Sequence, residues 1–156
     1  MGEGKIAVAS DHGAFEMKGH IIERLKELGY DPVDMGVYNE ESVDYPDYGI
    51  KVAEAVSSGK YKRGILLCGT GIGMSITANK FPGIRAALVH DNYTARMSRQ
   101  HNDSNILALG GRTTGVNVAY DILETWLNTE YEGGRHDRRL EKISKLEKKY
   151  TGANIL

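Results

Sequence analysis

The stretch Gly64-Ile65-Leu66-Leu67-Cys68-Gly69-Thr70-Gly71-Ile72-Gly73 decides the fold of this chain of 156 residues. Its first half is a short apolar run, typical of a buried strand, and its second half is a glycine-rich turn. The residues that follow have the spacing of a short helix. A strand that passes through such a turn into a helix is one unit of a parallel sheet.

The rest of the chain repeats this order of short β-rich runs and longer segments of helical period. The predicted strands are 5–10, a short strand around Val33, 64–68, 86–89 and 106–109. The predicted helices are a segment ending near Gly29, 47–58 after Pro46, a short helix after the glycine loop, 93–100, 119–127 and 137–150. This alternation predicts a three-layer α/β/α Rossmann-like fold with a five-stranded parallel sheet.

A single domain over residues 1–150 accounts for this pattern, because the chain has the common size of one domain and no interdomain linker. Its last helix has a narrow apolar stripe of Leu140, Ile143 and Leu146 among dense charges. A stripe this narrow suits packing on a partner subunit or in a shallow groove. Residues 151–156 are expected to form a frayed tail.

The composition excludes several classes of partner. Lys and Arg number 20 against 21 Asp and Glu, so no global field draws the chain to nucleic acid or to an anionic membrane. The N-terminus has no apolar stretch long enough for a signal peptide or a membrane span. One cysteine can form neither an internal disulfide nor a cysteine-rich zinc site, and this favours a cytoplasmic location.

The glycine loop after the third strand indicates an anion site. Glycines at three alternate positions let successive backbone N–H groups turn inward, and the following helix start adds partial positive charge. The alternative is a tight turn without a ligand. A dinucleotide fingerprint fails in both registers, because Met74 or Ile76 stands at its third glycine. Asp91, about twenty residues on, keeps a nucleotide-binding module open as an alternative.

Cys68 stands at the junction of strand and loop. The loop amides and the helix start can stabilise its thiolate, which would serve as a base or a nucleophile. The alternative is a small buried residue that fills space at a strand end.

Histidines stand at two further clusters. Asp11-His12 ends the first strand and is either an acid/base pair or a helix N-cap beside a surface imidazole. His101 lies among Arg99, Asn102 and other polar residues, where a histidine can also be a helix-dipole partner. The five histidines lack metal-ligand spacing, so we predict no metal ion.

Arg135 and Arg139 are four residues apart and would share one face of the last helix. Two guanidinium groups on one face can clamp a phosphate. The alternative is a solvated basic turn that pairs with Glu141.

Taken together, these clusters resemble the ribose-5-phosphate isomerase B family, which includes galactose- and allose-6-phosphate isomerases. The resemblance runs from Lys5 to about Tyr150. Its motifs are Ser10-Asp11-His12-Gly13, Asp44-Tyr45-Pro46, Cys68-Gly69-Thr70-Gly71-Ile72-Gly73, Ala78-Asn79-Lys80, Gly83-Ile84-Arg85-Ala86, Ser98-Arg99-Gln100-His101-Asn102-Asp103, Asn105-Ile106-Leu107-Ala108 and Glu132-Gly133-Gly134-Arg135-His136.

The resemblance implies an aldose-ketose isomerase that uses neither a metal nor another cofactor. Cys68 would take the C2 proton, and Met74 supports this role because another branch of the family has a glutamate base there. His101 would assist ring opening, with Thr70 as a further catalytic hydroxyl. The implied substrate contacts are Asp11, His12, Tyr45, Gly69, Gly71, Ile72, Gly73 and Asn102, and the implied phosphate ligands are Arg112, Arg135 and Arg139.

The resemblance also implies a homodimer, or a dimer of dimers, in which each active site combines groups from two subunits. The expected substrate is ribose 5-phosphate, with a hexose 6-phosphate as the alternative. A nucleotide-binding module and a purely structural dimerisation domain are the alternatives from other classes.

Overall fold

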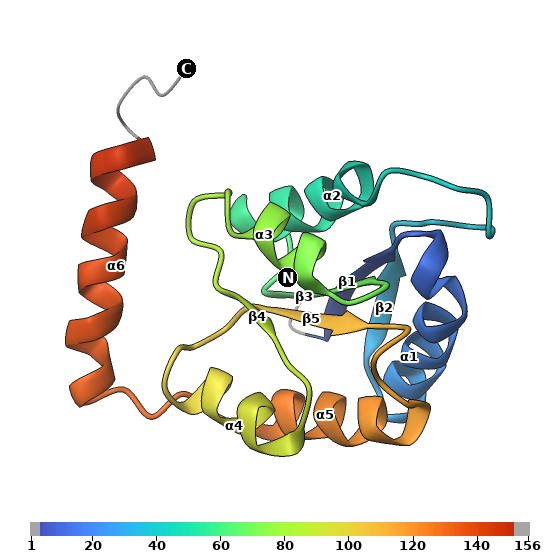
Figure 1. The fold of residues 1–156 in the computed structure, drawn as a ribbon. Helices are drawn as coiled ribbons and strands as arrows, with labels where there is room; N and C mark the ends of the chain where they lie inside the picture. The colour runs from blue at the N-terminus through green and yellow to red at the C-terminus, as the bar shows by residue number, and fades with distance from the viewer. Residues whose placement is uncertain (1–3, 152–156) are drawn as a thin grey trace.

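The computed structural model describes residues 4–151 and consists of a parallel sheet between two layers of helices (Figure 1). The five strands lie in the order β2-β1-β3-β5-β4. They are β1 (Lys5–Ser10), β2 (Asp31–Asp34), β3 (Arg63–Cys68), β4 (Ala86–Leu88) and β5 (Ile106–Gly110). All four pairings are parallel, so the predicted three-layer fold is confirmed.

The helices follow the strands as the sequence predicts. They are the 3-10 turn η1 (His12–Ala14), α1 (Phe15–Glu27), α2 (Tyr45–Ser57), α3 (Ile72–Ala78), α4 (Asn92–Gln100), α5 (Val116–Asn128) and α6 (Arg135–Thr151). Helices α2 and α6 begin two residues earlier than predicted, and α5 begins three residues earlier. In α2, Pro46 occupies the first turn rather than preceding it, where its missing N–H costs no helical hydrogen bond. Helix α6 begins at Arg135, directly after Gly133 and Gly134, whose φ angles are 63° and 59°.

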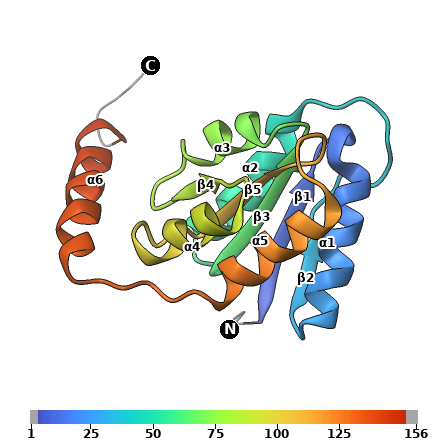
Figure 2. The same cartoon turned by 60° about the horizontal axis from the view of Figure 1, so that its bottom comes forward.

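The sheet divides the core into two parts because side chains alternate along each strand. In β3, Ile65 and Leu67 pack with α1, α4 and α5, whereas Leu66 and Cys68 pack on the other face with α2 and α3. Figures 1 and 2 show these two helical layers. Cys68, the last residue of β3, therefore lies beneath α3, at the margin of the part of the core that α2 and α3 cover.

Trp126 of α5 is the largest fully buried side chain, and it fixes the segment before β5. Its indole N–H donates to Ser104 Oγ at 2.8 Å. Arg99, which is 6% exposed, donates from one guanidinium nitrogen to the Ser104 carbonyl at 2.5 Å and to Asp103 at 2.9 Å. These contacts hold the turn that follows His101 against the body of the domain.

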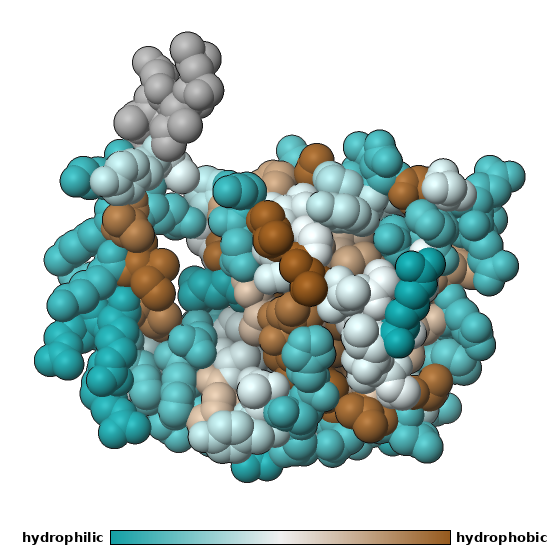
Figure 3. Space-filling view, in the orientation of Figure 1, coloured by the Kyte–Doolittle hydropathy of each residue, from teal (hydrophilic) through white to brown (hydrophobic). Residues whose placement is uncertain are grey.

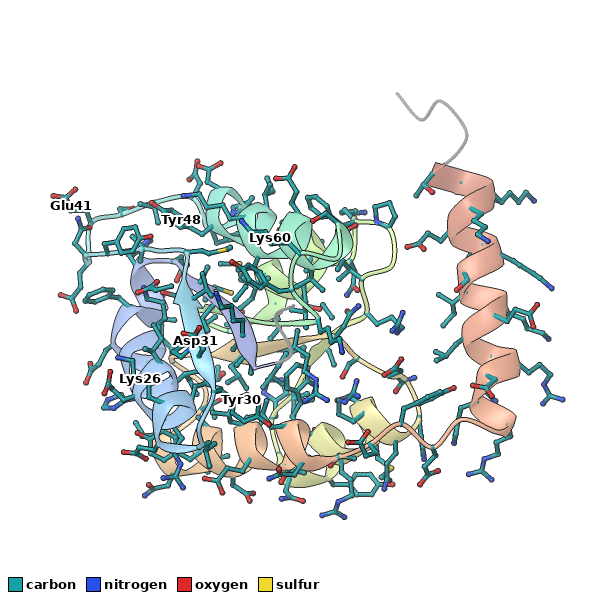
Figure 4. The ribbon with its side chains drawn as sticks, turned by 180° about the vertical axis from the view of Figure 1, so that it is seen from behind. Lys26, Tyr30, Asp31, Glu41, Tyr48 and Lys60 are labelled. Atoms are coloured by element: carbon teal, nitrogen blue, oxygen red, sulfur yellow. The ribbon has the colours of Figure 1, made fainter. Side chains whose placement is uncertain are left out.

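A buried lysine anchors the long loop between β2 and α2. Lys18 of α1 is 2% exposed, and its ammonium group donates to Asp34 Oδ1 and to the Val37 carbonyl, each at 2.6 Å. Two charge-assisted bonds satisfy a cation that would otherwise be costly to bury. The loop then runs outward to Glu41 at its tip (Figure 4) and returns to α2.

Helix α6 stands apart from the rest of the domain, joined to it by an extended segment (Figure 2). It contacts the body at its first turn through the ring of His136, which stacks on that of His101, and farther along through Glu147, whose carboxylate accepts from the Gly83 amide at 3.0 and 3.1 Å. Apolar side chains gather on the side of α6 that faces the body (Figure 3). Ile143 and Leu146 nevertheless remain 54% and 57% exposed.

The tail predicted at 151–156 lies mostly outside the described residues, and Thr151 is the last residue of α6. Within residues 4–151, none of the helices has the length and hydropathy that a membrane span requires.

Candidate active site

The glycine loop surrounds the thiol of Cys68 at the carboxyl edge of the sheet. Cys68 ends β3 opposite Gly110 of β5, and it is 5% exposed. The Gly71 amide donates to its Sγ at 3.1 Å. Gly71 has a φ of 78°, and a Cβ there would lie 2.9 Å from the carbonyl carbon of Leu109. Both the left-handed conformation and the close approach require glycine at this position.

Hydrogen bonds hold the rest of the glycine loop to the hydroxyl of Thr70 within it and to the segment after β5. The Ile72 amide donates to Thr70 Oγ1 at 3.3 Å. The Gly111 amide donates to the Cys68 carbonyl at 2.8 Å, and the Arg112 amide donates to the Gly69 carbonyl at 2.9 Å. The two loops therefore form one rigid rim around the thiol.

Arg112 and Asp11 both lie beside Gly13 at this rim. A Cβ built on Gly13 would lie 3.2 Å from Arg112 Nη2 and 3.4 Å from Asp11 Oδ1, and one built on Gly69 would lie 3.4 Å from Arg112 Nη1. Asp11 is 9% exposed, and its Oδ1 has no hydrogen-bond partner among residues 4–151. A buried carboxylate oxygen without a partner is placed to accept a bond from a bound hydroxyl group.

His12 is oriented by the long loop before α2. The Val43 amide donates to His12 Nδ1 at 3.1 Å. This bond makes Nδ1 an acceptor, so the proton of the neutral ring is on Nε2, which becomes a donor. Asp11 occupies the N-cap position of the turn η1, as one of the two alternatives has it, but its side chain makes no capping bond there.

Tyr45 lies against the other side of the glycine loop. A Cβ built on Gly73 would fall 2.5 Å from Tyr45 Cζ, so the ring occupies the space above that glycine. The tyrosine is 39% exposed. It therefore closes one side of the rim while its ring still reaches solvent.

A second cluster forms around His101, which follows the last residue of α4. Its ring stacks on that of His136, with 4.3 Å between centroids and 18° between planes. His136 is 5% exposed, and Glu132 Oε2 lies 3.6 Å from its Nε2. Burial lowers the pKa of His136, and the charges of His101, Arg135 and Arg139 lower it further. The ligand atoms of His101, Glu132 and His136 lie within 4.8 Å of one another, as a metal site would require.

The other predicted residues of this region lie beside the second cluster. Arg135 and Arg139 are exposed in the first turns of α6, one helical turn apart. Asn102 lines a hollow of about 320 Å³ between the body and α6, together with Leu140 and Ile143.

The two clusters lie at opposite ends of the strands of the sheet. Cys68 faces Gly110, where β5 ends, whereas His101 precedes Ile106, where β5 begins. A strand of this length spans about 16 Å. One sugar phosphate therefore cannot touch both Cys68 and His101 of the same chain, and the predicted site residues divide into two groups.

Sequence reasoning missed three features of these clusters. His136 stood in a quoted motif but received no role, and Glu132 and the Val43 amide received none either. The signal for His136 was its place between Arg135 and Arg139, the two predicted phosphate ligands. The Val43 contact has no sequence signal, because it joins residues that are 31 positions apart.

Asp91, which had kept nucleotide binding open, has a local role. Its carboxylate accepts from the Thr94 amide at 2.7 Å and caps α4, and these bonds lower the pKa of Asp91. This capping role accounts for the residue without a nucleotide.

The comparisons with known proteins agree with this geometry. The family model of Ribose/Galactose Isomerase matches residues 6–143. Ribose-5-phosphate isomerase B of Escherichia coli is 48% identical over 145 residues, which cover 93% of this chain and 97% of that protein. The solved structure of ribose-5-phosphate isomerase B of Clostridium thermocellum superimposes with a TM-score of 0.92 at 57% identity, over 94% of this chain and 99% of that one.

The type B ribose 5-phosphate isomerase of Trypanosoma brucei superimposes with a TM-score of 0.90 at 51% identity, over 94% of this chain and all of that one. Sequence and fold therefore lead to the same group of enzymes over nearly the whole chain. The chain belongs to the ribose/galactose isomerase family.

Proposed function

We propose that this chain interconverts ribose 5-phosphate and ribulose 5-phosphate, with Cys68 as the base that moves a proton between C2 and C1. The observation that carries this proposal is the Gly71 amide at 3.1 Å from Cys68 Sγ, inside a rim of loops at the carboxyl edge of the sheet. An N–H aimed at sulfur stabilises the thiolate, which is the form of cysteine that accepts a proton. Ligands of open parallel sheets bind at this edge.

The reaction begins with the open-chain aldose. The thiolate takes the C2 proton, the electron pair of the C–H bond forms the C1–C2 double bond of a cis-enediolate, and the carbonyl oxygen becomes negative. The proton of the C2 hydroxyl passes to the C1 oxygen, the C2 oxygen re-forms a carbonyl, and the electron pair of the C1–C2 double bond takes the proton back from the thiol at C1, which gives the ketose and restores the thiolate. One base can serve both carbons because they are adjacent.

The loop amides supply the stabilisation of the enediolate oxygen. Gly71 and Ile72 are engaged with Cys68 Sγ and Thr70 Oγ1, so this role falls to the other amides between Gly69 and Gly73. Removing one such donor typically raises the barrier by about 3 kcal/mol. Asp11, and His12 with its Nε2–H, would bind the sugar hydroxyls from the end of β1.

We further propose that each active site combines two chains of a homodimer. The partner subunit's His101 would open the sugar ring, since the chain's own His101 lies at the far edge of its sheet. The exposed stripe of Ile143 and Leu146 on α6 supports packing of this helix on the partner, as the sequence predicts. A dimer of dimers would repeat the same pair.

The phosphate would lie between the chains, with Arg112 on the Cys68 side and the partner subunit's Arg135 and Arg139 on the other. The exposure of both arginines on one helical turn supports this role. Because the single cysteine is a free thiol, a reducing, cytoplasmic location fits the proposal.

Arg135→Ala and Arg139→Ala are expected to raise KM for ribose 5-phosphate about tenfold each, with kcat changed much less. The reason is that the phosphate is remote from the reacting carbons, so its contacts contribute binding energy rather than bond rearrangement. Steady-state kinetics measure this. Lys148→Ala is the matched control, since Lys148 is an exposed basic residue on the opposite face of α6. A fall in kcat alone would contradict the clamp.

A hexose 6-phosphate is the alternative substrate, because the family description also names galactose. The reaction would be the same, but the pocket would have to take one more carbon. Competing turnover of ribose, allose and galactose phosphates decides between them by the ratio of kcat/KM values.

The experiment that tests the function is conversion of ribose 5-phosphate by the purified chain in excess chelator. Rapid formation of ribulose 5-phosphate is expected, since no step of the proposed mechanism uses a metal ion. If only hexose phosphates are converted, the substrate is wrong and the reaction class stands. If none is converted, the isomerase proposal fails.

A further inference from the structure

The second cluster holds three metal-ligating groups, of which Glu132 and His136 are four residues apart and His101 comes from a distant part of the chain. His101 follows α4, Glu132 lies in the segment after α5, and His136 is in the first turn of α6. One ligand atom of each lies within 4.8 Å of the other two. We call these three residues the His-Glu-His cluster.

The buried imidazole of His136 is an independent sign that this cluster takes a ligand. Its side chain is 6% exposed, and its Nε2 has no hydrogen-bond partner within residues 4–151. A buried ring nitrogen without a partner is rare and costly. The nearest carboxylate oxygen, Glu132 Oε2, is 3.6 Å away, so the nitrogen faces the cluster without bonding to it.

The donor set selects the kind of ligand. Two imidazole nitrogens and one carboxylate suit Zn²⁺ and neighbouring transition metals, whereas Mg²⁺ and Ca²⁺ prefer oxygen alone. The stacked rings must rotate for both nitrogens to face one ion. Glu132 is exposed and His101 half-buried, so both have room to adjust. The nearby Arg135 and Arg139 oppose a cation, which favours reversible binding.

We infer that the His-Glu-His cluster binds one divalent transition metal ion, for which Zn²⁺ is the probe, and that this ion reversibly inhibits the isomerase. Inhibition follows because a ring nitrogen of His101 that coordinates a metal can no longer act on a sugar. The inhibitory part rests on the proposed role of His101 in ring opening, whereas metal binding does not depend on it.

Binding is tested on the Cys68→Ala chain, which removes the thiol as a competing ligand. Titration calorimetry with Zn²⁺ should give one ion per chain. His136→Ala in this background should weaken binding at least about 100-fold, because loss of even an outer-shell partner costs up to that much. His90→Ala, which removes an exposed histidine, is the control and should bind unchanged. The metal site is overturned if His136→Ala binds Zn²⁺ as tightly as the Cys68→Ala chain, or if the Cys68→Ala chain itself binds none.

Inhibition is tested in the chain that keeps Cys68. Glu132→Gln should leave the activity in chelator unchanged and raise the Zn²⁺ concentration for half-inhibition about tenfold. Glu130→Gln changes an exposed carboxylate two residues away and should behave as the parent chain.

The outcomes of the two tests separate the claims. Zn²⁺ that binds without inhibiting an active enzyme overturns the regulatory role, and so does equal inhibition after Glu132→Gln. If the chain proves to have no isomerase activity, the calorimetry still decides the metal site.

Discussion

Replacing Cys68 with alanine is expected to lower kcat for ribose 5-phosphate about 10³-fold while the domain stays folded. The size follows from the role, because a positioned general base contributes about 10²- to 10⁴-fold. The fold should persist because alanine fits a small buried site beside Leu66 and needs no hydrogen bond. Steady-state kinetics measure the loss, and thermal unfolding checks that the domain is intact. Nearly normal turnover would contradict the assignment of Cys68 as base.

A mixture of subunits extends this result to the shared active site. Cys68→Ala and His101→Ala chains, each nearly inactive alone, should regain activity when refolded together. One site of the mixed dimer would then receive Cys68 from one chain and His101 from the other. If no activity returns although mixed dimers form, the two residues act within one chain or not together.

Gly71→Ala is expected to cost about 3 kcal/mol of folding stability and to lower kcat/KM about 10²-fold. An L-residue in the left-handed region costs about 1 to 2 kcal/mol, and forced contacts in a packed site add about as much again. Here the added Cβ would meet Leu88 Cδ1 at 2.6 Å and the Leu109 carbonyl carbon at 2.9 Å. The activity falls because the loop must move its amide away from Cys68 Sγ. Denaturant unfolding and steady-state kinetics measure the two effects.

Gly83→Ala is the matched control for this change. Gly83 also has a positive φ, of 73°, but nothing lies within 4 Å of an added Cβ. Gly83→Ala should lower the folding stability only by the cost of an L-residue in the left-handed region, about 1 to 2 kcal/mol, and leave kcat/KM nearly unchanged. If the two variants are equally stable and equally active, the close packing of the glycine loop has no functional importance.

The secondary structure and the loop chemistry were readable from the sequence because both are local. Short β-rich runs identified all five strands, helical periods identified the helices between them, and glycine spacing identified the loop that turns an amide toward Cys68. Pro46 and the pair Gly133 and Gly134 marked helix starts within two residues. The family resemblance then supplied the expected roles.

What depends on the path of the chain could be seen only in the tertiary structure. The sequence placed the His101 cluster before the fifth strand and Cys68 at the end of the third, but only the structure shows that these two strands are paired and parallel, so that the two residues lie at opposite ends of adjacent strands. The bond from Val43 to His12 and the burial of Lys18 depend on where a long loop returns.

The same holds for the His-Glu-His cluster, whose histidines showed no metal-ligand spacing. Glu132 and His136 are four residues apart, and His101 joins them only because the segment after α4 packs against the first turn of α6. The sequence by itself therefore determined the layers, the glycine loop and the thiol, because backbone periodicity and glycine conformations act over a few residues. Only the tertiary structure decided which distant side chains meet, because those contacts arise when whole elements pack.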